Sequence, residues 1–488
     1  MIQFDVDLAV IGSGFGGSLM AMIGQRLGLR TVLIDRANHP RFTIGESSTP
    51  IANMVLRDLV QRYKLTGIEP LCDYASAQQA YPDVTLGIKR GFTYFWHRTG
   101  EPFQPQADRS NEWLVPGNPD DLTADAHWLR SDVDRFLFKQ VRASSIATME
   151  NTDVTDITRD GDRWCVAGYH SEEPVRVFAQ FVLDASGGTG VMLKALEIPI
   201  SVDCMKTKTR TLYGHFTGVG NWVDAYQEAG GDVEGHPYRC DEAAVHHIIE
   251  GGWMWQLQFR NGVTSAGLVL DQDRHPYHPD RYPDEEWHLI VERYPTLAAQ
   301  FAGSRMHEAT FHMIGTDRLQ RIAERSAGAG WAGLPNVGGF VDPLHGTGIA
   351  QILCGIERLA AILERSWGRD DMEAQLEAYS RTVRTEIEFI DSLLHACYLA
   401  MDDFARFKST SRLYFVASSM YERRFRAGRI QPEHAFLCAD DELLRSAVLQ
   451  VVDRLTEDAQ LPAEQRADAA EFEQWIDGLL EPLEKNSD

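Results

Sequence analysis

A glycine-rich run near the start of the chain has the residue types and spacing of a turn that binds a dinucleotide. It reads Ile11-Gly12-Ser13-Gly14-Phe15-Gly16-Gly17-Ser18, between an expected buried strand at residues 4–11 and an expected helix at residues 19–27. Gly12 permits a tight turn, Gly14 lets the main chain approach a pyrophosphate, and Gly17 allows the helix to pack closely on the strand. The N–H groups at the helix start can bind phosphate oxygens, so this run predicts a dinucleotide site.

Two acidic residues at the ends of expected strands point to the same site. Asp35 follows the strand expected at residues 31–34 and lies 23 positions after Gly12, where a carboxylate can accept hydrogen bonds from ribose hydroxyls. Asp184 ends a second apolar run and is followed by a Gly187-Gly188 turn. A third segment, residues 338–349, is rich in small residues and precedes a helix expected at 350–363. Small residues suit close approach to a flat ligand.

The elements that must position these residues follow from local signals. A helix is expected at residues 51–63, because Thr49 is a good N-cap and Pro50 suits the first helical position. Residues 87–96 alternate as in a strand, and another helix opens near Leu129 with acids in its first turn. Residues 199–313 are rich in β-branched and aromatic residues, which predicts a largely antiparallel sheet facing the substrate.

The last part of the chain has a helical pattern from about residue 371 onward. Its apolar stripe consists of Leu443, Leu444, Ala447, Val448, Val451, Val452 and Leu455. The chain is therefore predicted to be an α/β protein with an antiparallel substrate layer and a helical C-terminal region. The expected divisions are a discontinuous cofactor domain at 1–200 and 315–365, a substrate-facing sheet domain at 201–314, and a helical region at 366–488.

Composition excludes several classes of protein. The 488 residues carry a formal net charge of −24, which argues against nucleic acid and anionic membrane surfaces as partners. The seven cysteines are scattered without a CxxC pair, which predicts a reduced, cytoplasmic protein without a cysteine-based metal site. We expect no membrane span and no export signal, because no apolar run of about 18 residues occurs. His246-His247 and the pair His275 and His278 lack partners at metal-ligand spacing, so no metal is expected.

Several motifs in a fixed order resemble those of the FAD-dependent halogenases, a branch of the flavin monooxygenases built on a glutathione-reductase-type FAD-binding domain. The resemblance spans roughly residues 5 to 365. It rests on the following segments: Gly12 to Gly17, Arg41, Gly45-Glu46-Ser47, Arg130, Asp184-Ala185-Ser186-Gly187, Trp253-Met254-Trp255, Asp342-Pro343-Leu344 and Thr347-Gly348.

The resemblance implies FAD as the cofactor and a halide ion as a co-substrate. Its FAD contacts map onto Gly12, Gly14, Phe15, Gly16, Gly17, Asp35, Arg36, Arg41, Ile44, Gly45, Glu46, Arg130, Val154, Asp184, Gly187, Asp342, Gly348 and Ile349. Its halide site maps onto Thr347 and Gly348, where backbone N–H groups of a glycine-rich turn can hold an anion. A second GxGxxG fingerprint for NAD(P)H is absent from the sequence, so an NAD(P)H-dependent flavin reductase is the expected partner that supplies reduced FAD.

The family's tryptophan motif, W-x-W-x-I-P, is proposed to keep substrates away from the flavin. Here it reads Trp253-Met254-Trp255-Gln256-Leu257-Gln258, so both tryptophans match while Leu257 and Gln258 depart from the pattern. The alternative is a strand with two tryptophans packed into a core.

A halogenase of this type needs a lysine that captures hypohalous acid. The resemblance assigns this role to Lys89, and burial beside aromatic residues would lower its pKa. The alternative is a solvated charge at a strand entry. His345 stands where tryptophan halogenases place a glutamate, and it either accepts a proton or packs against the flavin.

Three accounts of function remain open at this point. The first is a two-component halogenase that uses chloride or bromide on an electron-rich aromatic substrate, free or tethered to a carrier protein. The second is a flavin-dependent monooxygenase or dehydrogenase that uses no halide, and the third is a flavin-binding protein without catalysis. The chain is expected to be a monomer or a homodimer.

Overall fold

A parallel sheet at the centre of the fold brings three strand ends together. The computed structural model describes residues 1–461 and 468–485. Strand β1 (Ile2–Ile11) pairs in parallel with β2 (Thr31–Ile34) on one side and with β10 (Glu173–Asp184) on the other. Ile11 is in register with both Ile34 and Asp184. The glycine turn therefore leaves the sheet between the two predicted acids.

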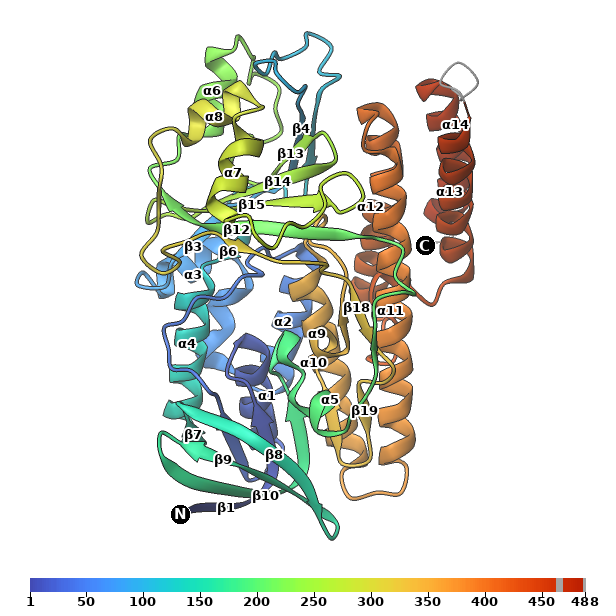
Figure 1. Ribbon diagram of the computed structural model, residues 1–488. Helices are drawn as coiled ribbons and strands as arrows, with labels where there is room; N and C mark the ends of the chain where they lie inside the picture. The colour runs from blue at the N-terminus through green and yellow to red at the C-terminus, as the bar shows by residue number, and fades with distance from the viewer. Residues whose placement is uncertain (462–467, 486–488) are drawn as a thin grey trace.

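This central sheet has eight strands, and its other members extend it on both sides (Figure 1). The order is β19-β20-β10-β1-β2-β7, with β9 pairing β10 and β8 pairing β9. The remaining bounds are β7 (Ala147–Met149), β8 (Thr152–Asp160), β9 (Arg163–His170), β19 (Ala327–Gly328) and β20 (Trp331–Gly333).

Four helices pack beside this sheet: α1 (Phe15–Arg26), α2 (Pro50–Arg62), α4 (Arg130–Ala143) and α10 (Thr347–Ser366). Helix α2 begins as predicted, since the Thr49 side chain accepts a hydrogen bond from the Ala52 N–H. Helix α1 begins at Phe15, earlier than expected, because Gly14 already serves as its N-cap. Residues 15–24 of α1 are all buried, so close packing extends to the phosphate-binding end.

A second eight-stranded sheet lies above the first in Figure 1. Its order is β16-β12-β15-β14-β13-β4-β5, with β17 pairing β12. The bounds are β4 (Gly91–Trp96), β5 (Glu112–Pro116), β12 (Thr209–Thr217), β13 (Ala244–Ile249), β14 (Gly252–Gln258), β15 (Val263–Asp271), β16 (Arg305–Met306) and β17 (Ile314–Gly315). All pairings are antiparallel except the parallel pair β13–β4. The predicted antiparallel layer is present, and β4 and β5 join it from an earlier part of the chain.

The expectation of one strand over residues 87–96 is wrong. Strand β3 (Leu86–Lys89) pairs with β6 (Asp125–Trp128) in a sheet of two strands, whereas β4 joins the second sheet. The chain changes partner at Arg90, whose N–H donates to Glu242 O at 2.7 Å and whose carbonyl accepts from the Gly117 N–H at 2.8 Å. The strand-like alternation of residues continues through the change of partner at Arg90, so the sequence pattern does not reveal that two strands are present.

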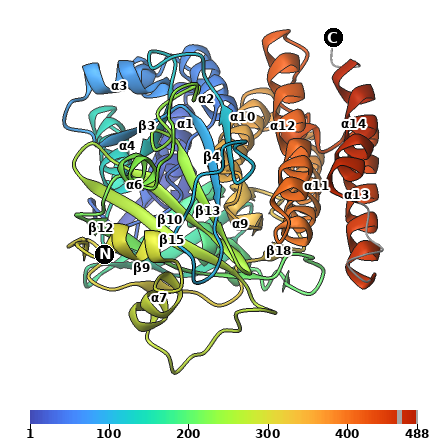
Figure 2. The same ribbon diagram turned by 90° about the horizontal axis from the view of Figure 1, so that it is seen from above.

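Four long helices stand along one flank of both sheets, coloured orange to red in Figures 1 and 2. They are α11 (Met372–Ala400), α12 (Phe404–Arg426), α13 (Glu442–Gln460) and α14 (Ala469–Lys485). The predicted stripe on α13 is buried except for Leu443, which is 56% exposed. Leu443 precedes Leu444 by one position, which turns its side chain about 100° away from the stripe. Residues 462–467 and 486–488 of the predicted helical region lie outside the described residues.

The remaining elements are short and connect the layers. They are α3 (Tyr74–Ala80), α5 (Val191–Ala195), α6 (Trp222–Glu228), α7 (Pro283–Val291), α8 (Pro295–Phe301), α9 (Pro335–Gly338), β11 (Ile200–Ser201), β18 (Arg321–Ala323), β21 (Gly339–Phe340) and the 3₁₀ turns Thr66–Cys72, Gly187–Thr189 and Phe436–Cys438. Across residues 1–461 and 468–485, we find no helix that combines the length and apolar character of a membrane span. The same residues contain no group of three His, Cys, Asp or Glu side chains arranged to hold a metal.

Candidate active site

The glycine turn after β1 is packed too tightly for side chains. Gly12 has a φ of +108°, and a Cβ there would lie 2.4 Å from the Ala185 carbonyl oxygen. A Cβ at Gly17 would lie 1.8 Å from the Gly12 carbonyl oxygen. The N-cap of α1 is Gly14, which has no side chain to cap the helix, and the Phe15 N–H donates to Asp134 Oδ1 at 3.2 Å. The turn therefore joins strand and helix closely and leaves the other N–H groups at the helix start for an anion.

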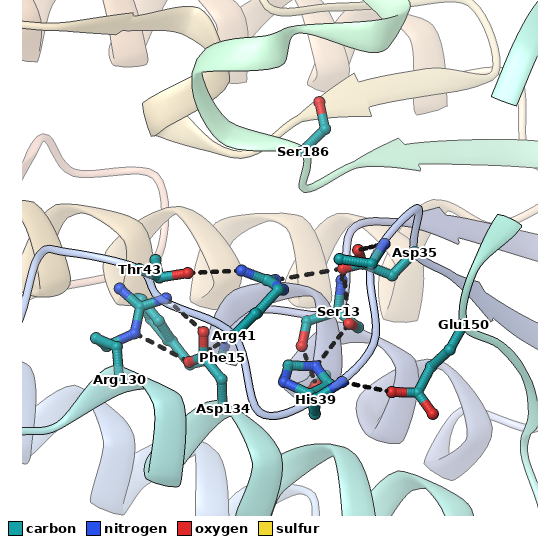
Figure 3. Close-up of polar contacts among 12 residues, drawn as sticks. Ser13, Phe15, Asp35, His39, Arg41, Thr43, Arg130, Asp134, Glu150 and Ser186 are labelled. Carbon is teal, nitrogen blue, oxygen red and sulfur yellow. Dashed lines mark hydrogen bonds and ion pairs between the residues drawn. The ribbon is translucent and has the colours of Figure 1, made fainter. Parts of the chain in front are cut away.

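Asp35 lies beside this turn and is held by several donors (Figure 3). Its Oδ2 accepts from the Ser13 N–H and the Ser13 hydroxyl, each at 2.7 Å, and lies 3.3 Å from Arg41 Nη2. Oδ1 accepts one hydrogen bond, from the Ala37 N–H at 2.9 Å. Burial opposes ionisation, but Arg41 and these hydrogen bonds hold the pKa of Asp35 below its usual value. Oδ1 keeps acceptor capacity for a ribose hydroxyl.

Asp184 uses its carboxylate within its own loop. Oδ1 accepts from the Ser186 N–H at 2.9 Å and the Ser186 hydroxyl at 2.6 Å, and Oδ2 accepts from the Met192 N–H at 2.7 Å. Burial raises the pKa of Asp184 despite these bonds. Ser186 lies opposite Asp35 and Arg41 in Figure 3, so this loop forms the other side of the site. Asp184 shapes that side, and its contact with the cofactor stays a prediction.

Arg130 connects α4 to the segment that follows Arg41. Its Nε and Nη2 donate to the two oxygens of Asp134, each at 2.9 Å, and its Nη1 donates to Ile44 O at 3.1 Å and Gly45 O at 3.0 Å. The guanidinium lies 4.8 Å from the centre of the Phe15 ring. Arg130 therefore fixes the Gly45 turn against the start of α1. Figure 3 shows its guanidinium bonded to Asp134 beside Phe15.

Residues 45–48 run from this turn to the second sheet, and we call them the strap. Glu46 is buried, and its Oε1 lies 3.0 Å from Nε2 of His215 on β12. The Trp128 N–H donates to Glu46 O at 2.7 Å, and the Ser48 N–H donates to Ala126 O at 3.1 Å. The strap thus bonds to both β6 and β12. Sequence analysis missed His215, because a single histidine within a strand carries no motif.

Lys89 lies behind the strap, at the end of β3. Its side chain is 0% exposed, so the alternative of a solvated charge is excluded. Nζ donates to Ser48 O at 2.6 Å and lies 4.0 Å from the centre of the Phe92 ring. Burial lowers the pKa of Lys89, against the opposing effect of the Asp125 carboxylate. The neutral amine form of Lys89 is therefore more favoured at this site than it would be in water.

His345 is buried in an aromatic cluster in the loop before α10. Its Nδ1 lies 3.2 Å from the Tyr94 hydroxyl, its Nε2 lies 3.6 Å from Cys397 Sγ, and its ring stacks on Tyr414 at a centroid distance of 4.5 Å. Burial holds the pKa of His345 well below its usual value, so the ring is neutral. Both nitrogens already face protein partners, which favours packing over proton transfer.

The turn after His345 opens toward free space. Gly346 has a φ of +62° and is the N-cap of α10, and no side chain of the described residues caps this end. Gly348 is exposed, and a Cβ there would meet no atom within 4 Å. Thr347, Gly348 and Ile349 therefore present helix N–H groups at an open surface, where an anion can bind.

The two tryptophans of β14 are buried beside the same loop. Trp253 Nε1 donates to the Tyr398 hydroxyl at 2.9 Å, and that hydroxyl donates to Asp342 Oδ2 at 3.0 Å. Burial raises the pKa of Asp342 to about 6. Trp255 Nε1 donates to Ser265 Oγ at 3.2 Å. The two tryptophans are packed as core residues are. Trp253 is in addition bonded through Tyr398 to Asp342, in the predicted cofactor-binding segment at residues 338–349.

The other predicted contacts lie around this framework. Arg36 is exposed just after Asp35, and Val154 is half-buried on β8. A Cβ at Gly16 would meet Leu334 at 2.6 Å, and one at Gly187 would lie 3.3 Å from Asn336 Nδ2.

A cavity of about 400 Å³ at the far end of β4 is lined by Trp96 and Phe103, among others, and lies away from Lys89.

The site fits a flavin dinucleotide. Helix α10 presents N–H groups at a start that no described side chain caps, and helix α1 presents those that remain beside the Phe15 N–H, which is bonded to Asp134. Asp35 Oδ1 retains acceptor capacity beside the glycine turn. The backbone at Gly348 is open, since a Cβ there would meet no atom within 4 Å. These features match the expected order of phosphate, ribose and flavin contacts.

Comparison with known proteins decides the family. The sequence model of the tryptophan halogenases matches residues 125–409, more than half of the chain. The chain belongs to this family. Monodechloroaminopyrrolnitrin halogenase PrnC of Pseudomonas fluorescens is 28% identical over 460 residues, 89% of this chain and 78% of PrnC. Tetracycline 7-halogenase of Kitasatospora aureofaciens is 28% identical over 430 residues, 86% of this chain and 74% of that enzyme.

Solved structures agree on the fold of this halogenase. The crystal structure of halogenase PltM in complex with phloroglucinol and FAD superposes with a TM-score of 0.83 at 23% identity, covering 98% of this chain and 96% of PltM. The predicted α/β fold with a helical C-terminal region is confirmed, and so is the resemblance to FAD-dependent halogenases. The protein is a flavin-dependent halogenase, and a flavin-binding protein without catalysis is excluded.

Proposed function

We propose that this halogenase works in two components: a separate NAD(P)H-dependent flavin reductase supplies reduced FAD, and Lys89 delivers the halogen to an electron-rich aromatic substrate. The observation that carries the proposal is the fully buried Lys89, bonded to the strap that runs from the Gly45 turn to the second sheet. A buried amine at this place can receive a halogen while water is excluded.

Bound reduced FAD would supply two electrons and two protons, so that reduced FAD, O₂, one chloride or bromide ion and one proton would give oxidised FAD, hypohalous acid and water. The chain's own contribution is an anion site at the start of α10, where the N–H groups of Thr347 and Gly348 hold the halide. The absence of a side-chain cap there among the described residues supports this assignment. Asp35, Arg41 and Arg130 hold the nucleotide and the strap around it.

Lys89 takes the hypohalous acid in one of two balanced ways. As an ammonium, it donates a hydrogen bond to the oxygen, and the aromatic carbon then takes the halogen while its proton and the oxygen leave as water. As an amine, it forms a nitrogen–halogen bond and releases water, after which the halogen passes to the aromatic carbon and the substrate proton returns to the amine. Burial, which lowers the pKa of Lys89, makes both forms accessible near neutral pH.

The substrate proposed is a phenol, pyrrole or indole-type ring. PltM has been crystallised with phloroglucinol, and a relative from Pseudomonas fluorescens, 20% identical, is named as a chlorinase of a pyrrole carried on a peptidyl-carrier protein. Both free and carrier-tethered rings are therefore candidates. His345, neutral and enclosed, shapes the wall beside Tyr94 and Tyr414 in this proposal.

The experiment compares Lys89→Met with a matched surface variant, Lys139→Met, whose lysine is exposed on α4. Each protein is incubated with FAD, a flavin reductase, bromide and a panel of phenols, pyrroles and indoles. We expect Lys89→Met to lose halogenated product by at least about 100-fold while FAD reoxidation continues, because general acid–base and covalent groups contribute 10²-fold or more. Full halogenation by Lys89→Met would overturn the role of Lys89.

Gln258 and His345 depart from the family pattern, so the use of halide by this halogenase is itself part of the proposal. The same incubation tests it, since an enzyme that only oxygenates its substrate forms hydroxylated products whether or not bromide is present.

A further inference from the structure

Lys89 faces a carboxylate that the proposed function does not use. Strands β3 and β6 are antiparallel, and their register places Lys89 directly opposite Asp125. Directly opposed residues have side chains on the same face with Cβ atoms about 5 Å apart. Lys89 is 0% exposed and Asp125 is 1% exposed. Two ionisable groups have therefore been removed from water together, which is costly unless each compensates the other.

A chain of hydrogen bonds joins the two groups through the strap and α2. Lys89 Nζ donates to Ser48 O at 2.6 Å, and Ser48 Oγ donates to Asn53 Oδ1 at 2.8 Å. Asn53 Nδ2 donates to Asp125 Oδ1 at 2.7 Å. All four side chains are buried. The orientation of Lys89 Nζ is thus coupled to Asp125 by the strand pairing on one side and by Asn53 on the other.

The two histidines near Lys89 carry no charge, and a further carboxylate of this region, Glu422, acts on Asp125. His127 on β6 and His246 on β13 face the lysine, and burial lowers the pKa of each to about 3, so both are neutral. On α12, Tyr414 and Glu422 lie toward Asp125. Among the described residues, Asp125 is the one carboxylate whose charge acts directly on Lys89. Arg90 is paired with Asp121 on the loop outside the cluster.

We propose that Asp125 is a positioning residue for halogen transfer: across the β3–β6 pair and through Asn53 and Ser48, it holds Lys89 Nζ and sets the pH at which Lys89 changes from ammonium to amine. This inference rests on the proposed role of Lys89. Burial alone favours the neutral amine, and the facing carboxylate restores part of the preference for the ammonium. The two effects together lower the pKa of Lys89 to about 8.

The direction of the effect of removing the carboxylate charge can be stated. In Asp125→Asn the ammonium loses its counter-charge, so the pKa of Lys89 falls further below its usual value. If the ammonium is the active form, halogenation declines with rising pH at a lower pH than in the wild type. If the amine is the active form, halogenation rises with pH at a lower pH than in the wild type. We call the part of the pH profile in which halogenation changes with the ionisation of Lys89 the Lys89 limb. In both cases this limb moves to lower pH, by about one to three pH units.

The test measures product formed per FAD reoxidised between pH 5 and 9, with flavin reductase, bromide and a phenol. This ratio separates halogen transfer from the flavin reaction. The proteins are the wild type, Asp125→Asn, Asp125→Ala, Asp125→Glu and Lys89→Met, with Asp121→Asn as the matched control because Asp121 is 65% exposed. The pH at which the Lys89 limb lies does not depend on what fraction of the protein is folded. If Asp125→Asn does not fold, Asp125→Ala takes its place in the comparison.

We expect the limb to move to lower pH in Asp125→Asn and Asp125→Ala, to return toward the wild-type position in Asp125→Glu, and to be unchanged in Asp121→Asn. An unmoved limb in Asp125→Asn or Asp125→Ala, with product abolished in Lys89→Met, would overturn the role of Asp125 and leave the proposed function standing. Full halogenation by Lys89→Met would instead overturn the proposed function itself.

Discussion

Replacing Tyr398 with phenylalanine removes one hydroxyl that joins the tryptophan pair to the loop before α10. That hydroxyl accepts from Trp253 Nε1 at 2.9 Å and donates to Asp342 Oδ2 at 3.0 Å. Trp253 is 1% exposed, so its N–H has no water to replace the lost acceptor. Asp342 Oδ2 keeps the hydrogen bond from the Thr209 hydroxyl at 2.6 Å. The change therefore leaves the buried Trp253 N–H without an acceptor and leaves Asp342 Oδ2 with one hydrogen bond instead of two.

The magnitude follows from these two losses. An unsatisfied buried donor costs about 1–3 kcal/mol, and loss of a second hydrogen bond to a group that keeps another partner costs about 1 kcal/mol. We expect Tyr398→Phe to lower the free energy of unfolding by about 2–4 kcal/mol. The matched control is Tyr379→Phe, because Tyr379 is also buried on α11 but donates a single hydrogen bond, to Gly333 O at 2.8 Å. That control is expected to lose about 1 kcal/mol.

Urea unfolding measures both variants, and a double-mutant cycle isolates the connection to Trp253. In a Trp253→Phe background the indole donor is already gone, so Tyr398→Phe is expected to cost about 1–2 kcal/mol less than in the wild type. If Tyr398→Phe lowers the free energy of unfolding equally in the wild type and in Trp253→Phe, the argument that the hydroxyl stabilises the fold by accepting from Trp253 is refuted. A loss in Tyr398→Phe no larger than in Tyr379→Phe would refute the estimate of an orphaned buried donor.

Three further predictions concern the glycine turn, the start of α10 and Asp342. Gly12→Ala is expected to abolish FAD binding in a fluorescence titration, because its Cβ would lie 2.4 Å from Ala185 O, whereas Gly28→Ala, with nothing within 4 Å, should keep it. Gly348→Ala should raise the free energy of unfolding by about 0.5–1 kcal/mol while weakening FAD binding; unchanged FAD affinity would place the flavin elsewhere. The pKa of Asp342 is raised to about 6, so its contribution is present at low pH and lost as the pH rises through 6. Urea unfolding should therefore show the wild type gaining stability relative to Asp342→Asn as the pH falls from 7 to 4, and a constant difference would contradict the shifted pKa.

Local signals were sufficient for much of the fold. The bounds of β2 agree with the prediction, and the start of α2 follows from Thr49 and Pro50. Both rest on contacts between neighbours in sequence. The start of α1 was placed too late, because Gly14 already serves as its N-cap. The break at Arg90 was missed because Glu242 and Gly117, which supply the contacts that decide it, are distant in sequence. Leu443 was placed on the buried stripe because of its apolar character, although its direction on α13 points it to solvent.

The sequence by itself determined the family and the class of cofactor site. A turn of small residues between strand and helix, an acid after the second strand and a small-residue loop before a helix are local patterns, and their order along the chain is specific. Which groups touch one another was decided only by the tertiary structure. Asp125, Asn53 and Ser48 meet Lys89 across separate segments, Glu46 meets His215 on another sheet, and Trp253 reaches Asp342 through a tyrosine of α11. The physical reason is burial: ionisation and hydrogen bonding depend on partners that folding brings close and on the water that it removes.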